Sequence, residues 1–459
     1  MARAQRGPNQ DLQRLLEASK TSRTWLAQQV NHLGRRQGLT LRYTYTSVTN
    51  WADYGMVPRH PVPSLIAVAL SERLSRPVTV TEIGMVSLPA ASTDMGLSFS
   101  RDPVDAVRVA CTFWSAVNRR QLLGQTFAIA AFTTPVTRWL VTPAAAATAR
   151  RDGARVGRAD LDELWQAADD ARAWDSKYGG GNWKASAITD CLQRRAAPLL
   201  HGSYSDDIGG ELFAVTAELS RMAAWSAVDV GHHDVAQRHF IQALALARAG
   251  GNVELGGYVL ATMALQTLLR GYAAEAVDMA QGAYERAQGT AAPRVLAFTR
   301  LIEARAHGRA GDARAAARAV AQCEQLLDRA EEHPDGEPAW ISYMTHARMS
   351  ADTTEVFRDL HRPAEALAWN DRAATMSADA FTRSVGMRFA IVGSAHLQAG
   401  RLDEGLDMGH RAVDILSRVQ STRALDYVRD YTAALRRWKA EIPVQDLLHR
   451  TRTELAIAG

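Results

Sequence analysis

A small residue recurs in a fixed frame five times in the second half of this 459-residue chain. It stands five residues after a turn each time, at Ala236, Ala276, Ala316, Ala366 and Gly405. The residues twelve positions earlier and seven positions later are also small: Ala224, Ala264, Ala304, Thr354 and Gly393, and then Ala243, Ala283, Cys323, Ala373 and Ala412. Small side chains in this frame let two antiparallel helices cross closely and stack on the next pair. The frame predicts an all-α chain with an α-solenoid of roughly 40-residue repeats.

The turns and spacings define the extent of this solenoid. The turn residues are Gly231, Gly271, Gly311, His361 and Gly400, and the successive repeats are 40, 40, 50 and 39 residues apart. The long spacing contains residues 331–338, which we interpret as an insertion. Residues 421–438 and 443–456 are expected to form helices that cover the last apolar face. Because solenoids hold partners in a curved groove, the pattern favours a binding protein over an enzyme.

The positive charge is concentrated at the N-terminal end. Residues 1–80 contain eleven Lys or Arg and four Asp or Glu, a balance of +7, whereas the whole chain is +4 and the remainder is therefore −3. A small basic region on a nearly neutral body indicates a polyanionic partner, with nucleic acid as the first choice.

The same region has a helical pattern of apolar residues. It reads Leu26-Ala27-x-x-Val30, then Ser47-Val48-x-x-Trp51-x-x-x-Gly55-x-x-Pro58, then Ile66-Ala67-x-Ala69-Leu70. We expect a small core made by these apolar side chains: Leu26, Val30, Val48, Trp51, Ile66 and Leu70. Gly55 and Pro58 should end the third helix, whose outer face is then free.

This pattern resembles the helix-turn-helix of the xenobiotic-response-element (Cro/C1-like) regulators. The resemblance implies that the third helix enters the major groove of double-stranded DNA. The candidate base contacts are Tyr45, Thr46, Thr49 and Asn50, and the candidate phosphate contacts are Arg35, Arg36, Arg42 and Arg59. About ten residues separate Leu33 from the third helix, where the family has three to four. That insertion leaves open an alternative, a helical bundle that makes protein contacts.

The arrangement of the whole chain resembles actinobacterial transcriptional regulators whose bodies look like tetratricopeptide (TPR) repeats. It implies a helix-turn-helix domain at residues 1–80, a linker at 81–101, a helical connecting region at 102–203 and a TPR-like domain at 204–459. In such repeats the first helix of each pair lines the concave groove. The groove candidates are Glu218, Arg221, Trp225, Tyr258, Phe298, Arg305, Arg348, Glu355 and Met387. Aromatic and Arg side chains there suit a peptide or small-molecule effector.

Several other functions are disfavoured by the sequence. Cys111, Cys191 and Cys323 lack metal-site spacing, and the adjacent His232 and His233 diverge on a helix, so we expect no metal. The glycines at 179–181 are not followed by Lys-Ser/Thr, and no nucleophile elbow or HExxH motif occurs. We therefore expect no enzyme activity and no cofactor. No apolar run approaches a membrane span, and we expect a cytoplasmic protein with no membrane contact.

These observations lead to one functional hypothesis and one alternative. The hypothesis is a sequence-specific DNA-binding transcriptional regulator that forms a homodimer, because single recognition helices usually pair on two half-sites. Its TPR-like domain would dimerise and sense the effector. The alternative is a TPR-type protein-interaction scaffold without specific DNA binding.

Overall fold

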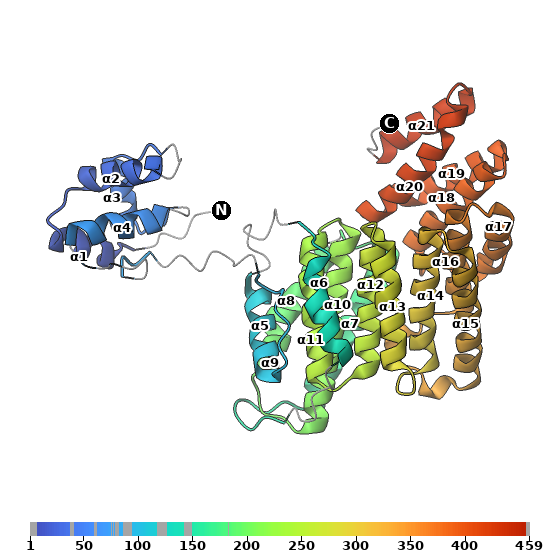
Figure 1. The fold of residues 1–459 in the computed structure, drawn as a ribbon, viewed down its shortest axis with the longest axis horizontal. Coiled ribbons are helices and arrows are strands. Elements are labelled where there is room, and N and C mark those ends of the chain that lie inside the picture. The colour runs from blue at the N-terminus through green and yellow to red at the C-terminus, as the bar shows by residue number, and fades with distance from the viewer. Residues whose placement is uncertain are drawn as a thin grey trace. The chain divides into compact units, whose positions relative to one another are not determined.

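The computed structural model describes residues 7–36, 41–58, 62–74, 76, 78, 82–85, 94–116, 126–141, 149–181 and 183–455. Among these residues the regular secondary structure is helical, and no β-strand is formed. The all-α prediction is therefore confirmed. The chain divides into two compact units, Met1–Thr93 and Asp94–Gly459 (Figure 1). In the part of the chain that is described, no helix has the length and hydrophobicity needed to cross a membrane.

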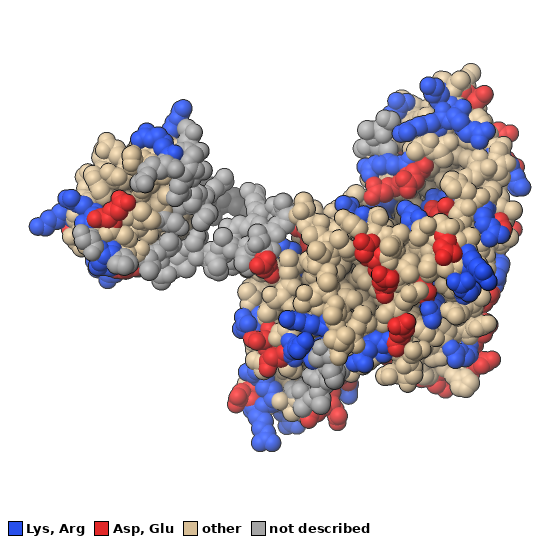
Figure 2. All heavy atoms as spheres, in the orientation of Figure 1, with Lys and Arg blue, Asp and Glu red and all other residues tan. Residues whose placement is uncertain are grey.

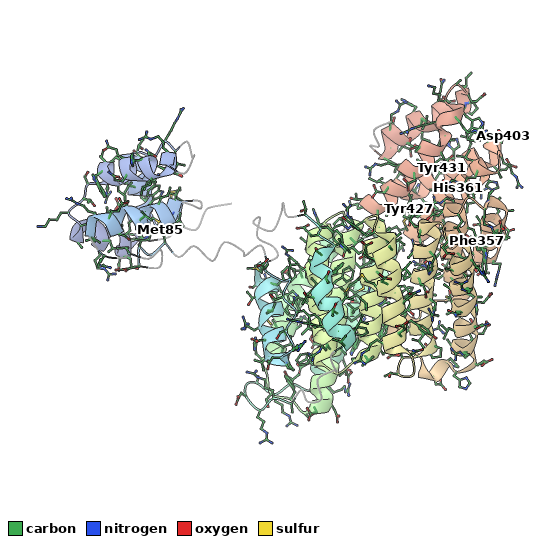
Figure 3. The ribbon with its side chains drawn as sticks, in the orientation of Figure 1. Met85, Phe357, His361, Asp403, Tyr427 and Tyr431 are labelled. Atoms are coloured by element: carbon green, nitrogen blue, oxygen red, sulfur yellow. The ribbon has the colours of Figure 1, made fainter. Side chains whose placement is uncertain are left out.

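The first unit is a four-helix bundle of α1 (Gln10–Ala18), α2 (Arg23–Arg36), α3 (Tyr45–Asp53) and α4 (Val62–Leu74). All six side chains expected in its core are buried, from Leu26 on α2 to Leu70 on α4. Ile83 and Met85, which the sequence analysis assigns to the linker, are also fully buried in this core (Met85 is labelled in Figure 3). The first unit therefore extends beyond residue 80.

The second unit begins with helices that precede the repeat frame. These are α5 (Pro103–Ala116), α6 (Ala130–Val141), α7 (Arg158–Tyr178), α8 (Trp183–Cys191), the π-helical turn η1 (Leu192–Ala196) and α9 (Ala197–Leu200). Residues 94–101 pack on this unit, because the Gln242 amide donates to the carbonyl oxygens of Gly96 and Ser98 (2.7 and 3.1 Å). Residues 86–93 of the expected linker lie outside the described part.

Five antiparallel helix pairs follow in the register that the small residues predict. They are α10 (Asp206–Asp229) with α11 (His233–Ala249), α12 (Val253–Leu269) with α13 (Ala273–Ala287), α14 (Pro293–Ala310) with α15 (Ala313–Glu332), α16 (His346–Asp359) with α17 (Pro363–Arg372), and α18 (Thr382–Gln398) with α19 (Leu402–Leu416). The short helices η2 (Pro334–Gly336) and η3 (Ala339–Ile341) lie between α15 and α16, η2 within the expected insertion, and η4 (Ala373–Thr375) follows α17.

Every small residue of the frame is buried, which confirms its packing role. The four glycine turns adopt φ between 77° and 89°, and the fifth turn adopts the same left-handed conformation with a non-glycine residue, His361, at φ 55°. Left-handed backbone ends each first helix sharply and reverses the chain. Cys323 is fully buried at its frame position, so it packs as a small apolar side chain.

The chain ends in α20 (Thr422–Ala434), η5 (Leu435–Trp438) and α21 (Ile442–Leu455). Helices α20 and α21 bury Val428, Tyr431, Val444 and Leu447 against α18 and α19. The Tyr431 hydroxyl donates to the carbonyl oxygen of Gly405 (2.8 Å), and both Tyr427 and Tyr431 lie on α20 in Figure 3. Helix α20 also contacts α10, and α18 contacts α7. The first helices of the repeat pairs are therefore contacted by helices that precede and follow the repeats.

Candidate functional site

Helix α3 of the first unit presents a polar face. Tyr45 is 55 % exposed, Thr46 is exposed, and Thr49 and Asn50 are half-buried. The N-terminus of α3 is capped by Thr44, whose backbone N–H donates to the Ser47 hydroxyl (3.2 Å). The four predicted contact residues on this helix thus lie within about one and a half turns of one capped helix.

An ion pair that the sequence analysis missed supports this helix. The Arg23 guanidinium donates to both Asp53 oxygens (2.7 and 2.8 Å) and to the Thr49 hydroxyl (3.2 Å). These hydrogen bonds, with a further one from Gln13 (2.9 Å), lower the pKa of Asp53. Arg23 and Asp53 are 30 residues apart, so no local pattern connects them. The pair joins the start of α2 to the end of α3.

The long connection between α2 and α3 is anchored at its end. The Asn31 side chain donates to the Tyr43 carbonyl oxygen (2.8 Å) and accepts from the Tyr43 N–H (2.9 Å). The Tyr43 ring packs edge-on against Trp51 with ring centroids 5.0 Å apart. Leu41 lies over Gly34 so closely that a Cβ on that glycine would meet its Cδ1 at 2.4 Å. Leu41 and Tyr43 therefore pack on the bundle directly before α3.

The candidate phosphate contacts have different positions. Arg35 is exposed near the end of α2, and Arg42 is exposed three residues before α3. Arg36 is helical but its side chain, like the whole of Arg59, lies outside the described residues. Lys and Arg side chains project from several places on the face of the first unit that Figure 2 shows.

The second unit contains a cavity among the first helices of the repeat pairs, with a volume of about 630 Å³ including its open part. Arginines from five helices line it: Arg172 (α7), Arg221 (α10), Arg348 (α16), Arg383 (α18) and Arg423 (α20). Five aromatic side chains also line it: Trp225, Tyr258, Phe298, Tyr343 and Phe381. Residues far apart in sequence thus converge on one space.

The aromatic side chains form a connected wall. The Tyr258 ring is 5.1 Å from Phe298 and 4.9 Å from Trp340, and its hydroxyl lies 2.8 Å from that of Tyr343. Guanidinium groups lie against two of the lining rings: the Arg221 Cζ is 4.6 Å from the Tyr258 ring centroid, and the Arg423 Cζ is 5.0 Å from that of Trp225. Planar apolar faces beside cations suit a ligand that is itself aromatic and charged.

Buried carboxylates hold the arginines in place. Glu218 is fully buried and accepts from Arg221 (2.7 and 2.8 Å) and Arg172 (3.0 Å). Burial alone would raise the pKa of Glu218, but the charges of Arg221 and Arg172 hold it below its ordinary value. Glu218 is thus ionised and fixes the positions of Arg221 and Arg172, which line the cavity.

Asp229, the last residue of α10, likewise holds arginines of α18 and α20 in place. It is fully buried and accepts from the Gly180 N–H (2.8 Å) and the Ser421 hydroxyl (2.9 Å). It also pairs with Arg383 (3.0 Å) and Arg423 (3.1 Å). Burial opposes ionisation of Asp229, yet Arg383 and Arg423 keep its pKa below the ordinary value.

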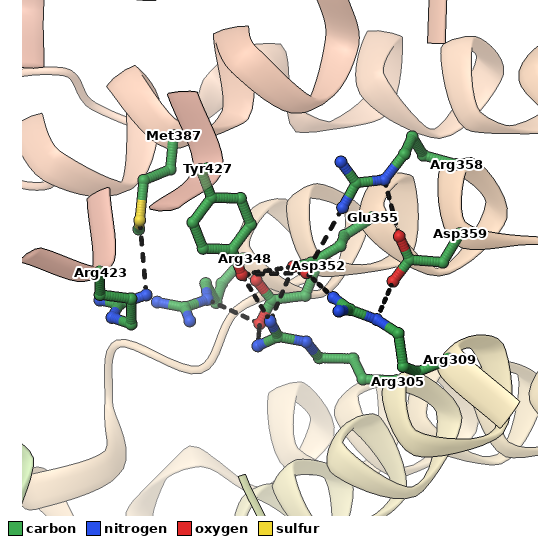
Figure 4. Close-up of polar contacts among 10 residues, drawn as sticks. All are labelled: Arg305, Arg309, Arg348, Asp352, Glu355, Arg358, Asp359, Met387, Arg423 and Tyr427. Atoms are coloured by element: carbon green, nitrogen blue, oxygen red, sulfur yellow. Dashed lines mark hydrogen bonds and ion pairs between the residues drawn. The ribbon is translucent and has the colours of Figure 1, made fainter. Parts of the chain in front are cut away.

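A second cavity of about 360 Å³ adjoins the first, because Arg348, Ser384 and Arg423 line both. Figure 4 shows the ion network at its edge, in which Glu355 accepts from Arg305 (2.7 Å) and from the Tyr427 hydroxyl (2.9 Å). Burial and the Glu355 charge raise the pKa of Tyr427 to about 12. Asp352 pairs with Arg348 (3.0 Å).

The predicted groove residues gather around these cavities. The first cavity is lined by Arg221, Trp225, Tyr258, Phe298 and Arg348, and the second by Arg305, Arg348, Glu355 and Met387. Glu218 lies behind the first cavity wall, where it holds Arg221. Sequence reasoning missed five lining residues: Arg172, Tyr343, Phe381, Arg383 and Arg423. They lie in a helix before the frame, in the connection directly before α16, at the start of α18 or in the expected cap.

In the described part of the chain, neither cavity is lined by a cysteine or a histidine. The described residues contain no group of three or more His, Cys, Asp or Glu able to hold a metal ion. His239 is buried with its ring 4.7 Å from that of Phe113, and burial lowers its pKa to about 3. It is therefore a neutral core side chain at ordinary pH.

A family model described as the SP15 N-terminal domain matches residues 12–86. The matched segment falls within the first unit and includes the buried Ile83 and Met85. No curated protein and no solved structure matches the chain.

Proposed function

We propose that the chain is a sequence-specific DNA-binding transcriptional regulator whose second unit senses an effector. The observation that carries this proposal is the exposed polar face of α3 on a small, separately packed unit with excess positive charge. Hydroxyl and amide groups on such a helix can read base edges, Asn50 being suited to adenine. Arg35 and Arg42 would contact phosphates on either side.

The proposal assigns effector binding to the TPR-like second unit. Its support is the pair of adjoining cavities, which are lined by aromatic and Arg side chains, most of them from the first helices of the repeat pairs. An effector would change DNA binding by having different affinities for two states of the protein. Two copies of the chain would occupy two half-sites of one operator.

The test is to recover DNA with the full-length protein. We would incubate the purified chain with sheared genomic DNA from its own source and sequence what it retains at about 150 mM salt. A palindromic motif is the expected result. Diffuse recovery that is lost at higher salt would contradict sequence-specific binding and leave non-specific attraction.

The alternative, a protein-interaction scaffold, has its own support in the first unit. Three apolar side chains after α3 are exposed: Tyr54 (59 %), Met56 (49 %) and Val57 (39 %). Such exposure is typical of a surface that contacts another protein. Heparin retention separates the two functions, because the scaffold predicts weak retention and no competition by duplex DNA.

A further inference from the structure

The two adjoining cavities differ in character, and the difference indicates what they hold. The first is lined by the aromatic side chains of Trp225, Tyr258 and Phe298, which do not line the second. Arg348 and Arg423 stand where it meets the second, and the second also contains Arg388. Because Arg172, Arg221 and Arg383 also line the first cavity, the combined space has aromatic side chains at one end and arginines along its whole length.

Arg348 and Arg423, which line both cavities, retain unused donor groups. Arg348 donates from Nε to Asp352 (3.0 Å), and its two terminal nitrogens have no hydrogen-bond acceptor among the described residues. Arg423 donates from Nε to Asp229 (3.1 Å), but its Nη1 faces the Met387 sulfur at 3.4 Å. A thioether is a weak acceptor. These guanidinium groups can therefore accept a further anionic partner.

Arg388 adds a charge that the protein does not balance. Its side chain is 8 % exposed, and its Nη1 donates to the Ala373 carbonyl oxygen (2.6 Å). No carboxylate pairs with it among the described residues, whereas each of the other two arginines has one. Because a guanidinium stays protonated, a buried one without a counter-ion favours binding of an anion.

We propose that the adjoining cavities bind one amphipathic anion, with an aromatic body against Trp225, Tyr258 and Phe298 and an anionic group on Arg348 and Arg423. The inference rests on the proposed function only in naming the effector, since the binding itself requires no DNA. Aromatic carboxylates, sulfonates and phosphates share the required chemistry.

The test uses two fluorescent probes that differ in one group. 8-Anilino-1-naphthalenesulfonate carries an anionic sulfonate, and N-phenyl-1-naphthylamine has the same rings without it. The full-length protein is expected to bind one sulfonate probe per chain at least tenfold more tightly than the neutral probe. Equal affinities, or several sulfonate probes per chain, would overturn the proposal.

Variants locate the site. Arg348→Gln should weaken binding of the sulfonate probe about tenfold and leave the neutral probe unchanged. The matched control is Arg300→Gln, since Arg300 also lies against a tyrosine ring (Tyr284, 3.5 Å) and pairs with a carboxylate but lines neither cavity. It should change neither affinity. An unchanged sulfonate affinity in Arg348→Gln would place the probe elsewhere.

A filling variant keeps the test valid if Arg348→Gln does not fold. Ser384 is half-buried and lines both cavities, so Ser384→Phe should block the junction with every arginine retained. It is expected to reduce binding of the sulfonate probe at least tenfold. Wild-type affinity in this variant would contradict the assignment. Failure to recover an operator would leave this result standing, so the two proposals fail separately.

Discussion

At the residue scale, the account depends on a few polar side chains whose surroundings differ sharply. Thr46 is exposed and Asn50 half-exposed on a small helical unit, whereas His239 and Asp229 are buried in the second unit. Exposed polar groups change binding when they are replaced, while buried ones change folding. Substitutions at these positions therefore test different parts of the account.

Replacement of Asn50 tests base recognition. Asn50→Ala should weaken binding to the recovered operator by roughly 1–3 kcal/mol and relax the sequence preference at one base pair. The measurement is fluorescence anisotropy with matched and mismatched duplexes. Since Asn50 is half-buried on α3, thermal unfolding of the variant provides the control. Wild-type affinity for the operator would show that α3 does not read bases.

Replacement of Arg35 tests phosphate contact. Because Arg35 is exposed near the end of α2, Arg35→Ala should weaken binding to all duplexes alike. The slope of log affinity against log salt should become shallower by about one charge. A titration from low to moderate salt with two unrelated duplexes measures it. A loss confined to one duplex would reassign Arg35 to base reading.

His239 predicts a pH dependence of stability. Its pKa is lowered by burial to about 3, below the ordinary 6.5, so the unfolded chain takes up a proton between these values that the folded chain does not. The contribution of His239 to the free energy of unfolding is therefore complete above pH 6.5. From this group alone, the free energy of unfolding should fall by about 2 kcal/mol by pH 5.

The measurement is denaturant unfolding at several pH values between 7 and 5. His239→Leu removes the titrating group and should flatten the loss. A variant that loses as much stability as the wild type over this range would show that His239 is not the cause.

At the element scale, the turn within each helix pair decides how the next helix docks. Gly311 and His361 occupy equivalent turns at φ 82° and 55°. Glycine adopts this conformation without steric cost and other residues do not. The fourth turn is therefore strained relative to the others, and the strain lies in the backbone.

A pair of substitutions isolates the strain. His361→Gly should raise the free energy of unfolding by roughly 0.5–1 kcal/mol, because it relieves the left-handed strain. Gly311→Ala should lower it by about 1 kcal/mol, since an added Cβ there meets no atom within 4 Å and changes only the backbone energy. Denaturant unfolding measures both. A destabilised His361→Gly would indicate that the imidazole makes a compensating contact.

At the scale of the whole molecule, ion pairs join helices of the second unit that are far apart in sequence. Asp229 connects α10 to the Gly180 backbone, to Arg383 on α18 and to Arg423 on α20. Removal of one partner from such a cluster leaves buried charges uncompensated. Arg383 and Arg423 therefore both join these helices and line the first cavity.

Asp229→Asn should destabilise the second unit by roughly 3–5 kcal/mol, because Arg423 loses its carboxylate partner and the buried Arg383 keeps only Asp175. Thermal unfolding gives the size of the effect, and hydrogen exchange should show earlier opening of α20. Asp407→Asn is the matched control, since its pair with Arg411 is more than half exposed and worth little. Equal effects of the two substitutions would contradict the structural role of Asp229.

The sequence predicts the repeats far better than the cavity. Close helix crossings require small side chains at fixed spacings, so Ala236 and its equivalents show directly in the sequence. The pairing of Arg383 with Asp175 spans 208 residues, and no periodicity indicates it. Likewise, Ile83 follows a stretch without a clear period, yet it is buried in the first unit. A close helix crossing involves residues near one another in sequence, so its steric requirement appears in their spacing. The contact of α20 with α10 depends instead on how all the helices between them stack.

The most direct test of the central claim is the affinity of the full-length protein for its recovered operator and for a scrambled duplex of the same composition at about 150 mM salt. The account predicts a specificity ratio of about 10³ or more, carried by the first unit. Equal affinities that fall together as salt is raised would contradict it, because they would leave only phosphate attraction.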